Sequence, residues 1–126
     1  MKRGIYSATC SILNNDYSLN VEATINHAAS SISNGLHGAI FFGSTGQSQL
    51  IDQNSKKNLI SKVANHKLRK QFFFGTGSNS LNETIDLIKY ENSVYKYEKR
   101  NWRSNYLCSP HPCCFKKVQN TSFITS

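Results

Sequence analysis

The sequence lacks long hydrophobic runs. No apolar stretch in its 126 residues approaches the roughly 20 that a membrane-spanning helix needs, so we expect no membrane partner. Lys2 and Arg3 precede a short stretch that polar residues interrupt, which argues against a secretory signal. A protein without such a signal keeps its thiols reduced, and the sequence therefore predicts a cytoplasmic location.

Two familiar binding patterns are also missing. The glycine-rich turn at 43–47 lacks the Gly-Lys-Ser/Thr ending with which a P-loop holds phosphates and magnesium. Cys108, His111, Cys113 and Cys114 gather within one short segment, but they lack the paired Cys-x₂-Cys spacing of structural zinc sites. The sequence predicts neither a cofactor nor a metal, and a metal site in 108–114 is kept as an alternative.

Acidic residues are scarce. The chain has 7 Asp and Glu against 15 Lys and Arg, a net charge of +8. Residues 1–90 hold nine basic and five acidic side chains, and residues 91–126 hold six and two, so each part carries +4. A basic excess that is spread in this way gives at most a nonspecific attraction to polyanions.

The first 90 residues repeat a strand-then-helix plan three times. Apolar runs bounded by turn residues predict the strands, and apolar residues at helical spacing predict the helices. The corresponding strand centres Tyr6, Ile40 and Phe73 lie 34 and 33 positions apart (40 − 6 and 73 − 40). We predict strands at 4–9, 37–42 and 71–74, and helices beginning near residues 18, 52 and 80.

Local signals mark the ends of these helices. Ser18 is the predicted N-cap of the first helix, and Asn34 with Gly35 supplies a left-handed stop. The second helix is expected from about 52 to 69. Ser80 and Glu83 have the spacing of a capping box, which opens the third helix.

The strand sequences predict the fold class. Residues 39–42 and 72–74 are continuous apolar runs, which is typical of strands in a parallel sheet that is covered on its faces. Barrels and open α/β sheets place their ligands at the carboxyl ends of such strands. The turns Gly43–Gly46 and Gly75–Gly77 both follow strands and fall at this edge.

The turn at 43–47 has the composition of an anion site. Gly43 and Gly46 permit unusual backbone conformations and expose N–H groups, and the hydroxyls of Ser44 and Thr45 add donors. This arrangement suits a carboxylate. An ordinary strand-to-helix connection has similar residues, so the loop alone leaves both interpretations open.

Three stretches of the sequence form a recognisable set. They are Gly4-Ile5-Tyr6-Ser7-Ala8-Thr9, the run from Gly35 through Phe41-Phe42-Gly43-Ser44-Thr45-Gly46-Gln47, and Phe74-Gly75-Thr76-Gly77-Ser78-Asn79. Together they resemble the dihydrodipicolinate synthase / N-acetylneuraminate lyase family of class I, pyruvate-handling aldolases. Two positions depart from the family pattern. Gln47 stands where the family usually has Glu, and Ser11-Ile12 stands where a Thr-Pro pair ends the first strand.

The resemblance implies a fold and a site. It implies part of a TIM (β/α)₈ barrel, with about three βα units in residues 1–90. Ser44 and Thr45 would bind the carboxylate of a 2-keto acid such as pyruvate, and Gly43, Gly46, Gly75 and Gly77 would shape the pocket. Members of this family form homo-oligomers.

The resemblance also implies that catalysis needs more than these residues. The family forms a Schiff base on a lysine of the sixth strand and moves protons with a tyrosine after the fourth, and neither has a matching position here. A barrel of this kind takes about 250 residues. We therefore expect a truncated member of the family with no catalytic residue, which is inactive in lyase chemistry by itself.

Residues 91–126 form an irregular basic tail by composition. The family pattern stops there without a linker, which suggests an out-of-frame or disordered segment. Basic and aromatic residues are interleaved in it, namely Lys96, Lys99, Arg100 and Arg103 with Tyr95, Tyr97, Trp102 and Tyr106. Cations neutralise phosphates and rings stack on bases, so the alternative function is a non-enzymatic module that binds nucleic acid through this tail.

Overall fold

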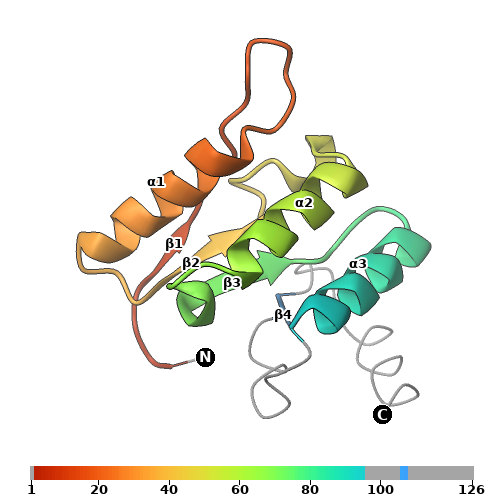
Figure 1. Cartoon of the computed structure of the whole chain (residues 1–126). Coiled ribbons are helices and arrows are strands. Elements are labelled where there is room, and N and C mark those ends of the chain that lie inside the picture. The colour runs from red at the N-terminus through yellow and green to blue at the C-terminus, as the bar shows by residue number, and fades with distance from the viewer. Residues whose placement is uncertain (1, 96–105, 108–126) are drawn as a thin grey trace.

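The computed structural model describes residues 2–95 and 106–107 (Figure 1). Strands and helices alternate along the chain, and this confirms the predicted α/β units. The strands are β1 (Tyr6–Ala8), β2 (Gly38–Phe41), β3 (Phe72–Gly75) and β4 (Tyr106–Leu107). The α-helices are α1 (Val21–Ser33), α2 (Gln53–Ala64) and α3 (Leu81–Val94), and two short 3₁₀ helices are η1 (Ser48–Leu50) and η2 (Arg69–Gln71).

The sheet is parallel throughout the described strands, in the order β1-β2-β3-β4. Ile40 at its centre lies opposite Ala8 of β1 and Phe73 of β3. Figure 1 shows the three α-helices side by side on one face of the sheet, and α2 contacts both α1 and α3. Parallel strands with helices on one face are the arrangement of a (β/α) barrel segment.

The segment that we expected to be irregular contributes regular structure at two places. Helix α3 continues to Val94, four residues beyond the predicted boundary at 90. Further along, Tyr106 and Leu107 pair in parallel with Phe74 and Gly75 and form β4. The alternative metal site in 108–114 and the basic stretch at 96–103 lie outside the described residues.

Phenylalanine rings form the centre of the core between sheet and helices. Phe41, Phe72 and Phe74 are all buried, and the ring centroid of Phe41 lies 5.2 Å from that of Phe72 and 5.7 Å from that of Phe74. Leu59 of α2 and Leu87 of α3 are buried with them. The ring of Phe73 instead contacts Tyr6 edge-to-face at 5.5 Å. The side chains of β3 therefore pack on both sides of the sheet, as its continuous apolar run predicts.

The predicted start of the first helix is wrong by two residues. Ser18 does not cap the helix, because its N–H and hydroxyl both bond to the carboxylate of Asp16 within a tight turn. A short antiparallel bridge between Leu13 and Leu19 closes that turn. Asn20 is the N-cap, and its side-chain oxygen accepts the N–H of Ala23 at 3.0 Å.

The ends of the other helices follow local signals more closely. Asp52 caps α2 through the N–H of Ser55, and Ser80 caps α3 through the N–H of Glu83. At the end of α1, Gly35 has φ of 107°, as the predicted left-handed stop requires. Helix α2 ends at Ala64, earlier than the expected residue 69, and the Arg69 guanidinium donates to the Ala64 carbonyl there.

Candidate functional site

The connection from β2 to α2 leaves the sheet through a residue in an unusual conformation. Phe42 has φ of 59°, in the left-handed region that side chains rarely adopt, and Gln47 has φ of 52°. Such a conformation costs a non-glycine residue about 1–2 kcal/mol. Packing holds Phe42 in place, since it is buried and its ring lies 6.5 Å from that of Phe74. The core therefore sets the direction in which residues 43–47 leave the sheet.

A second anchor ties this loop to the end of β1. The hydroxyl of Ser11 donates to the carbonyl of Gly46 at 2.6 Å. A Cβ at Gly46 would lie 2.9 Å from the carbonyl oxygen of Thr9, which is too close for any side chain. Glycine at 46 therefore permits the close approach of two backbone segments.

The other predicted pocket glycines differ from one another. A Cβ at Gly75 would collide with the carbonyl of Phe42, so β3 and the start of the loop approach closely here. A Cβ at Gly43 would meet nothing within 4 Å. Gly77 lies in the connection from β3 to α3. Close packing accordingly requires glycine at 46 and 75. That all four glycines shape a substrate pocket stays a prediction.

Ser44 and Thr45 are both exposed at the carboxyl edge of the sheet. The carbonyl of Ser44 accepts the N–H of Gln47 at 3.1 Å, which closes the turn. Neither hydroxyl is hydrogen-bonded to another residue in the described part of the chain. Both hydroxyls are therefore available to a ligand.

Two buried hydroxyls at the same edge were missed by the sequence analysis. Thr9 directly follows β1 and Thr76 directly follows β3, and they are 2% and 1% exposed. Neither Oγ1 atom has a hydrogen-bond partner among residues 2–95. A buried polar group without a partner costs roughly 1–3 kcal/mol, so such groups often mark a binding site. The signal in the sequence was a threonine directly after each of these two strands.

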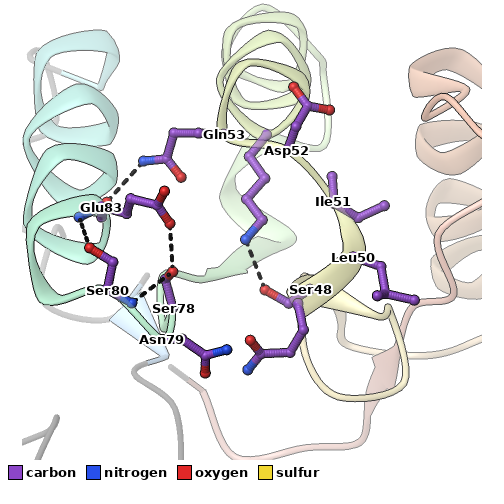
Figure 2. Close-up of a pocket in the computed structure, with 11 residues that line it drawn as sticks. Ser48, Leu50, Ile51, Asp52, Gln53, Ser78, Asn79, Ser80 and Glu83 are labelled. Carbon is purple, nitrogen blue, oxygen red and sulfur yellow. Dashed lines mark hydrogen bonds between the residues drawn. The ribbon is translucent and has the colours of Figure 1, made fainter.

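A pocket of about 430 Å³ lies next to this loop (Figure 2). Figure 2 shows Ser48 of η1 and the start of α2 on one side, and Ser78, Ser80 and Glu83 on the other. Ser44 and Thr45 do not line this pocket. The pocket and the predicted carboxylate site are therefore different places on the described surface.

The pocket contains a buried lysine. Lys56 on α2 is 4% exposed, and its Nζ donates to the hydroxyl of Ser48 at 3.1 Å. Burial lowers the pKa of the Lys56 amine below its ordinary value, and the carboxylates of Glu83 and Asp52 partly oppose this change. In the sequence, Lys56 carries no signal of a special role, because a lysine on a helix is usually exposed.

The opposite wall of the pocket is held by hydrogen bonds around the first turn of α3. The hydroxyl of Ser78 donates to Glu83 Oε2 at 2.8 Å and accepts the N–H of Ser80 at 3.3 Å. On the α2 side, Gln53 Nε2 donates to the carbonyl of Glu83 at 2.9 Å. The bond from Gln53 crosses from α2 to α3 and joins the two walls of the pocket (Figure 2).

Clusters of metal-ligating side chains and membrane-spanning helices are both absent from residues 2–95 and 106–107. This part of the chain contains no group of three or more His, Cys, Asp or Glu side chains arranged to hold a metal ion. None of its helices is both long and apolar enough to cross a bilayer.

Comparison with known proteins finds one family and several solved structures that are similar to this chain. The Dihydrodipicolinate synthetase family is matched over residues 1–94. No curated protein sequence matches the chain. Among solved structures, dihydrodipicolinate synthase from Agrobacterium tumefaciens superposes with a TM-score of 0.68 at 21% identity, over 85% of this chain and 35% of that one.

Two further structures have similar folds. YagE, a prophage protein of Escherichia coli K12 solved in complex with pyruvate, gives a TM-score of 0.63 at 24% identity and covers 72% of this chain and 31% of its own. The N-acetylneuraminate lyase of Proteus mirabilis gives 0.64 at 22% identity, over 71% of this chain and 31% of its own. The chain thus spans about a third of the length of these proteins.

Proposed function

This chain belongs to the dihydrodipicolinate synthetase family, and from that premise we propose that its 43–47 loop binds the carboxylate of a 2-keto acid such as pyruvate. The observation that carries the proposal is the pair of exposed hydroxyls, Ser44 and Thr45, on a turn that the core holds in place. A related fold has been solved with pyruvate bound.

The turn suits a carboxylate for two physical reasons. Hydrogen bonds to a charged acceptor contribute roughly 1.5–3 kcal/mol each, more than those between neutral groups. In addition, the left-handed Phe42 and the bond from Ser11 to Gly46 fix the loop before a ligand arrives. A preformed loop loses little conformational entropy on binding.

We further propose that these 126 residues bind the keto acid without cleaving carbon–carbon bonds. Class I aldolase chemistry needs a lysine that forms a Schiff base and a tyrosine that moves protons. The family resemblance implies positions for both beyond the third helix, and residues 1–94, over which the family match extends, do not reach them. The function proposed for this chain is therefore that of a partial barrel with a substrate-carboxylate loop.

The test is a pyruvate titration followed by NMR or calorimetry. Replacing Ser44 with Ala and Thr45 with Val together should weaken binding by at least about tenfold, because two hydrogen bonds to the carboxylate are lost. Ser30→Ala, at an exposed position on α1, is the matched control and should leave the affinity unchanged. Equal affinity of the double variant and the parent would refute the proposal.

Turnover is measured separately. Incubation of the 126-residue chain with N-acetylneuraminate and a coupled assay for released pyruvate should give no signal above buffer. Sustained release of pyruvate would contradict the proposed lack of lyase activity and would leave the binding proposal unaffected.

A further inference from the structure

Lys56 is a buried cation without an ionic partner in contact. Its side chain is 4% exposed, and no carboxylate of residues 2–95 forms an ion pair with it. The hydrogen bond to Ser48 is to a neutral hydroxyl, and the amine lies 5.8 Å from the ring centroid of Phe42. A lysine in such surroundings is held in the neutral form more easily than an exposed one, and the neutral amine is a nucleophile.

Hydroxyl and amide groups dominate the pocket that this amine lines. They come from three serines, one asparagine and two glutamines, which are Ser48, Ser78, Ser80, Asn79, Gln49 and Gln53. The charged groups of the lining are Lys56, Asp52 and Glu83, so carboxylates outnumber cations there. This lining favours a neutral ligand rich in hydroxyls and disfavours an anion.

We propose that Lys56 forms a reversible imine with a small hydroxylated aldehyde bound in this pocket. The pocket, of about 430 Å³, has room for a ligand of a few carbon atoms beside the amine. The inference does not depend on the carboxylate loop, since Ser44 and Thr45 do not line the pocket.

The reaction is a condensation that needs no oxidant or reductant. Lys56 first loses its ammonium proton to water, and the nitrogen lone pair then attacks the carbonyl carbon of the aldehyde. The C–N bond forms as the carbonyl electron pair moves to oxygen. The nitrogen then releases one proton to water and the oxygen takes up one, which gives a neutral carbinolamine. Loss of one water molecule then gives the imine. When the imine takes up a proton, the nearby carboxylates of Asp52 and Glu83 stabilise its positive charge.

Ser48 has a part in this step as a positioning residue. Its hydroxyl accepts a hydrogen bond from the ammonium and is able to donate one to the neutral amine, since a hydroxyl is both donor and acceptor. It therefore holds the nitrogen toward the pocket in both protonation states. Glu83 is itself held by Ser78, so the negative charge near the amine has a fixed place.

The alternative is a lysine that is buried for packing alone. Its methylene groups would then cover Phe42 while the ammonium reaches the water of the pocket. A lysine of this kind would react with aldehydes no faster than the exposed Lys67. The two interpretations therefore differ in the relative reaction rate of two lysines within one protein.

The experiment uses the unmodified chain with glyceraldehyde and cyanoborohydride, which reduces imines to stable secondary amines. Peptide mapping by mass spectrometry gives the initial labelling rate at each lysine. We expect the rate at Lys56 to exceed that at Lys67 by about tenfold or more. Propanal, which lacks hydroxyls, and pyruvate, which is an anion, should both lose this preference for Lys56.

Variants refine the result. Ser48→Ala should slow labelling at Lys56 and leave the rate at Lys67 unchanged, and Lys67→Arg is the matched control that should not affect Lys56. Labelling at Lys56 that equals or falls below that at Lys67 in the unmodified chain would overturn the proposal. Labelling by propanal that is as selective as that by glyceraldehyde would overturn the assignment to hydroxylated ligands. Neither outcome bears on pyruvate binding at the 43–47 loop.

Discussion

The burial of Glu91 predicts that a single substitution stabilises this protein in a pH-dependent way. Glu91 on α3 is 2% exposed, and its Oε2 atom has no hydrogen-bond partner in the described part of the chain. Burial raises the pKa of its carboxyl group well above the ordinary value of 4.5. The folded protein therefore keeps a proton on Glu91 at a pH where the unfolded chain has released it.

The sign and size of the effect follow from proton linkage. The unfolded carboxyl group titrates near pH 4.5, and the folded one titrates at higher pH. Between these two values the folded state binds one more proton, so the free energy of unfolding falls as pH rises, by about 1.4 kcal/mol per pH unit. Below the unfolded pKa both the folded and the unfolded chain hold the proton, so this loss of stability is absent there. At pH 7 this loss of stability reaches at most about 3.4 kcal/mol, which is 7 − 4.5 = 2.5 pH units at about 1.36 kcal/mol each, and it stops growing once the folded group itself ionises.

The assay compares Glu91→Gln with the parent by urea denaturation in steps from pH 4 to pH 8. We expect nearly equal stability at pH 4 and an advantage of about 1–3 kcal/mol for the variant at pH 7, because glutamine has similar shape and no charge. Glu22→Gln, at an exposed position on α1, is the control and should differ from the parent by less than about 1 kcal/mol throughout. A difference for Glu91→Gln that stays constant across this range would refute the reasoning.

Two further predictions concern the backbone around the candidate site. Gly75→Ala should lower the free energy of unfolding by about 1–3 kcal/mol, because its Cβ would collide with the Phe42 carbonyl. Gly43→Ala, where a Cβ meets nothing, should change the free energy of unfolding by less than about 0.5 kcal/mol. Thermal unfolding measures both variants, and equal losses would contradict the close approach of Gly75 to Phe42. Phe42→Gly should be more stable than Phe42→Ala by about 1 kcal/mol, since both remove the ring and glycine alone accepts φ of 59° without strain. Chemical denaturation measures this, and a more stable alanine variant would show that the left-handed conformation is not retained.

Local patterns were sufficient to predict most of the elements. Three apolar runs predicted the strands, and Asp52 and Ser80 correctly marked the starts of α2 and α3. These signals succeed because capping and side-chain periodicity act within one or two turns of chain. The prediction of Ser18 as an N-cap was wrong because another short-range interaction prevails. The carboxylate of Asp16, two residues away, accepts hydrogen bonds from the Ser18 N–H and hydroxyl.

The site was predictable in its location and less so in its members. A turn of small residues after a strand in a parallel α/β pattern already indicates the carboxyl edge, where Ser44 and Thr45 are found. The unpaired hydroxyls of Thr9 and Thr76 were not apparent, because a threonine after a strand is common and its burial depends on neighbouring segments.

By itself, the sequence determined the order and type of the elements, because hydrophobic period, caps and turn residues are properties of short segments. The tertiary structure alone decided which polar groups lose contact with water. Lys56 and Glu91 both lie on helices and resemble surface residues in the sequence, yet both are buried in the structure. Their protonation depends on desolvation by residues from other elements, and this can be known only when the helices and the sheet are in place.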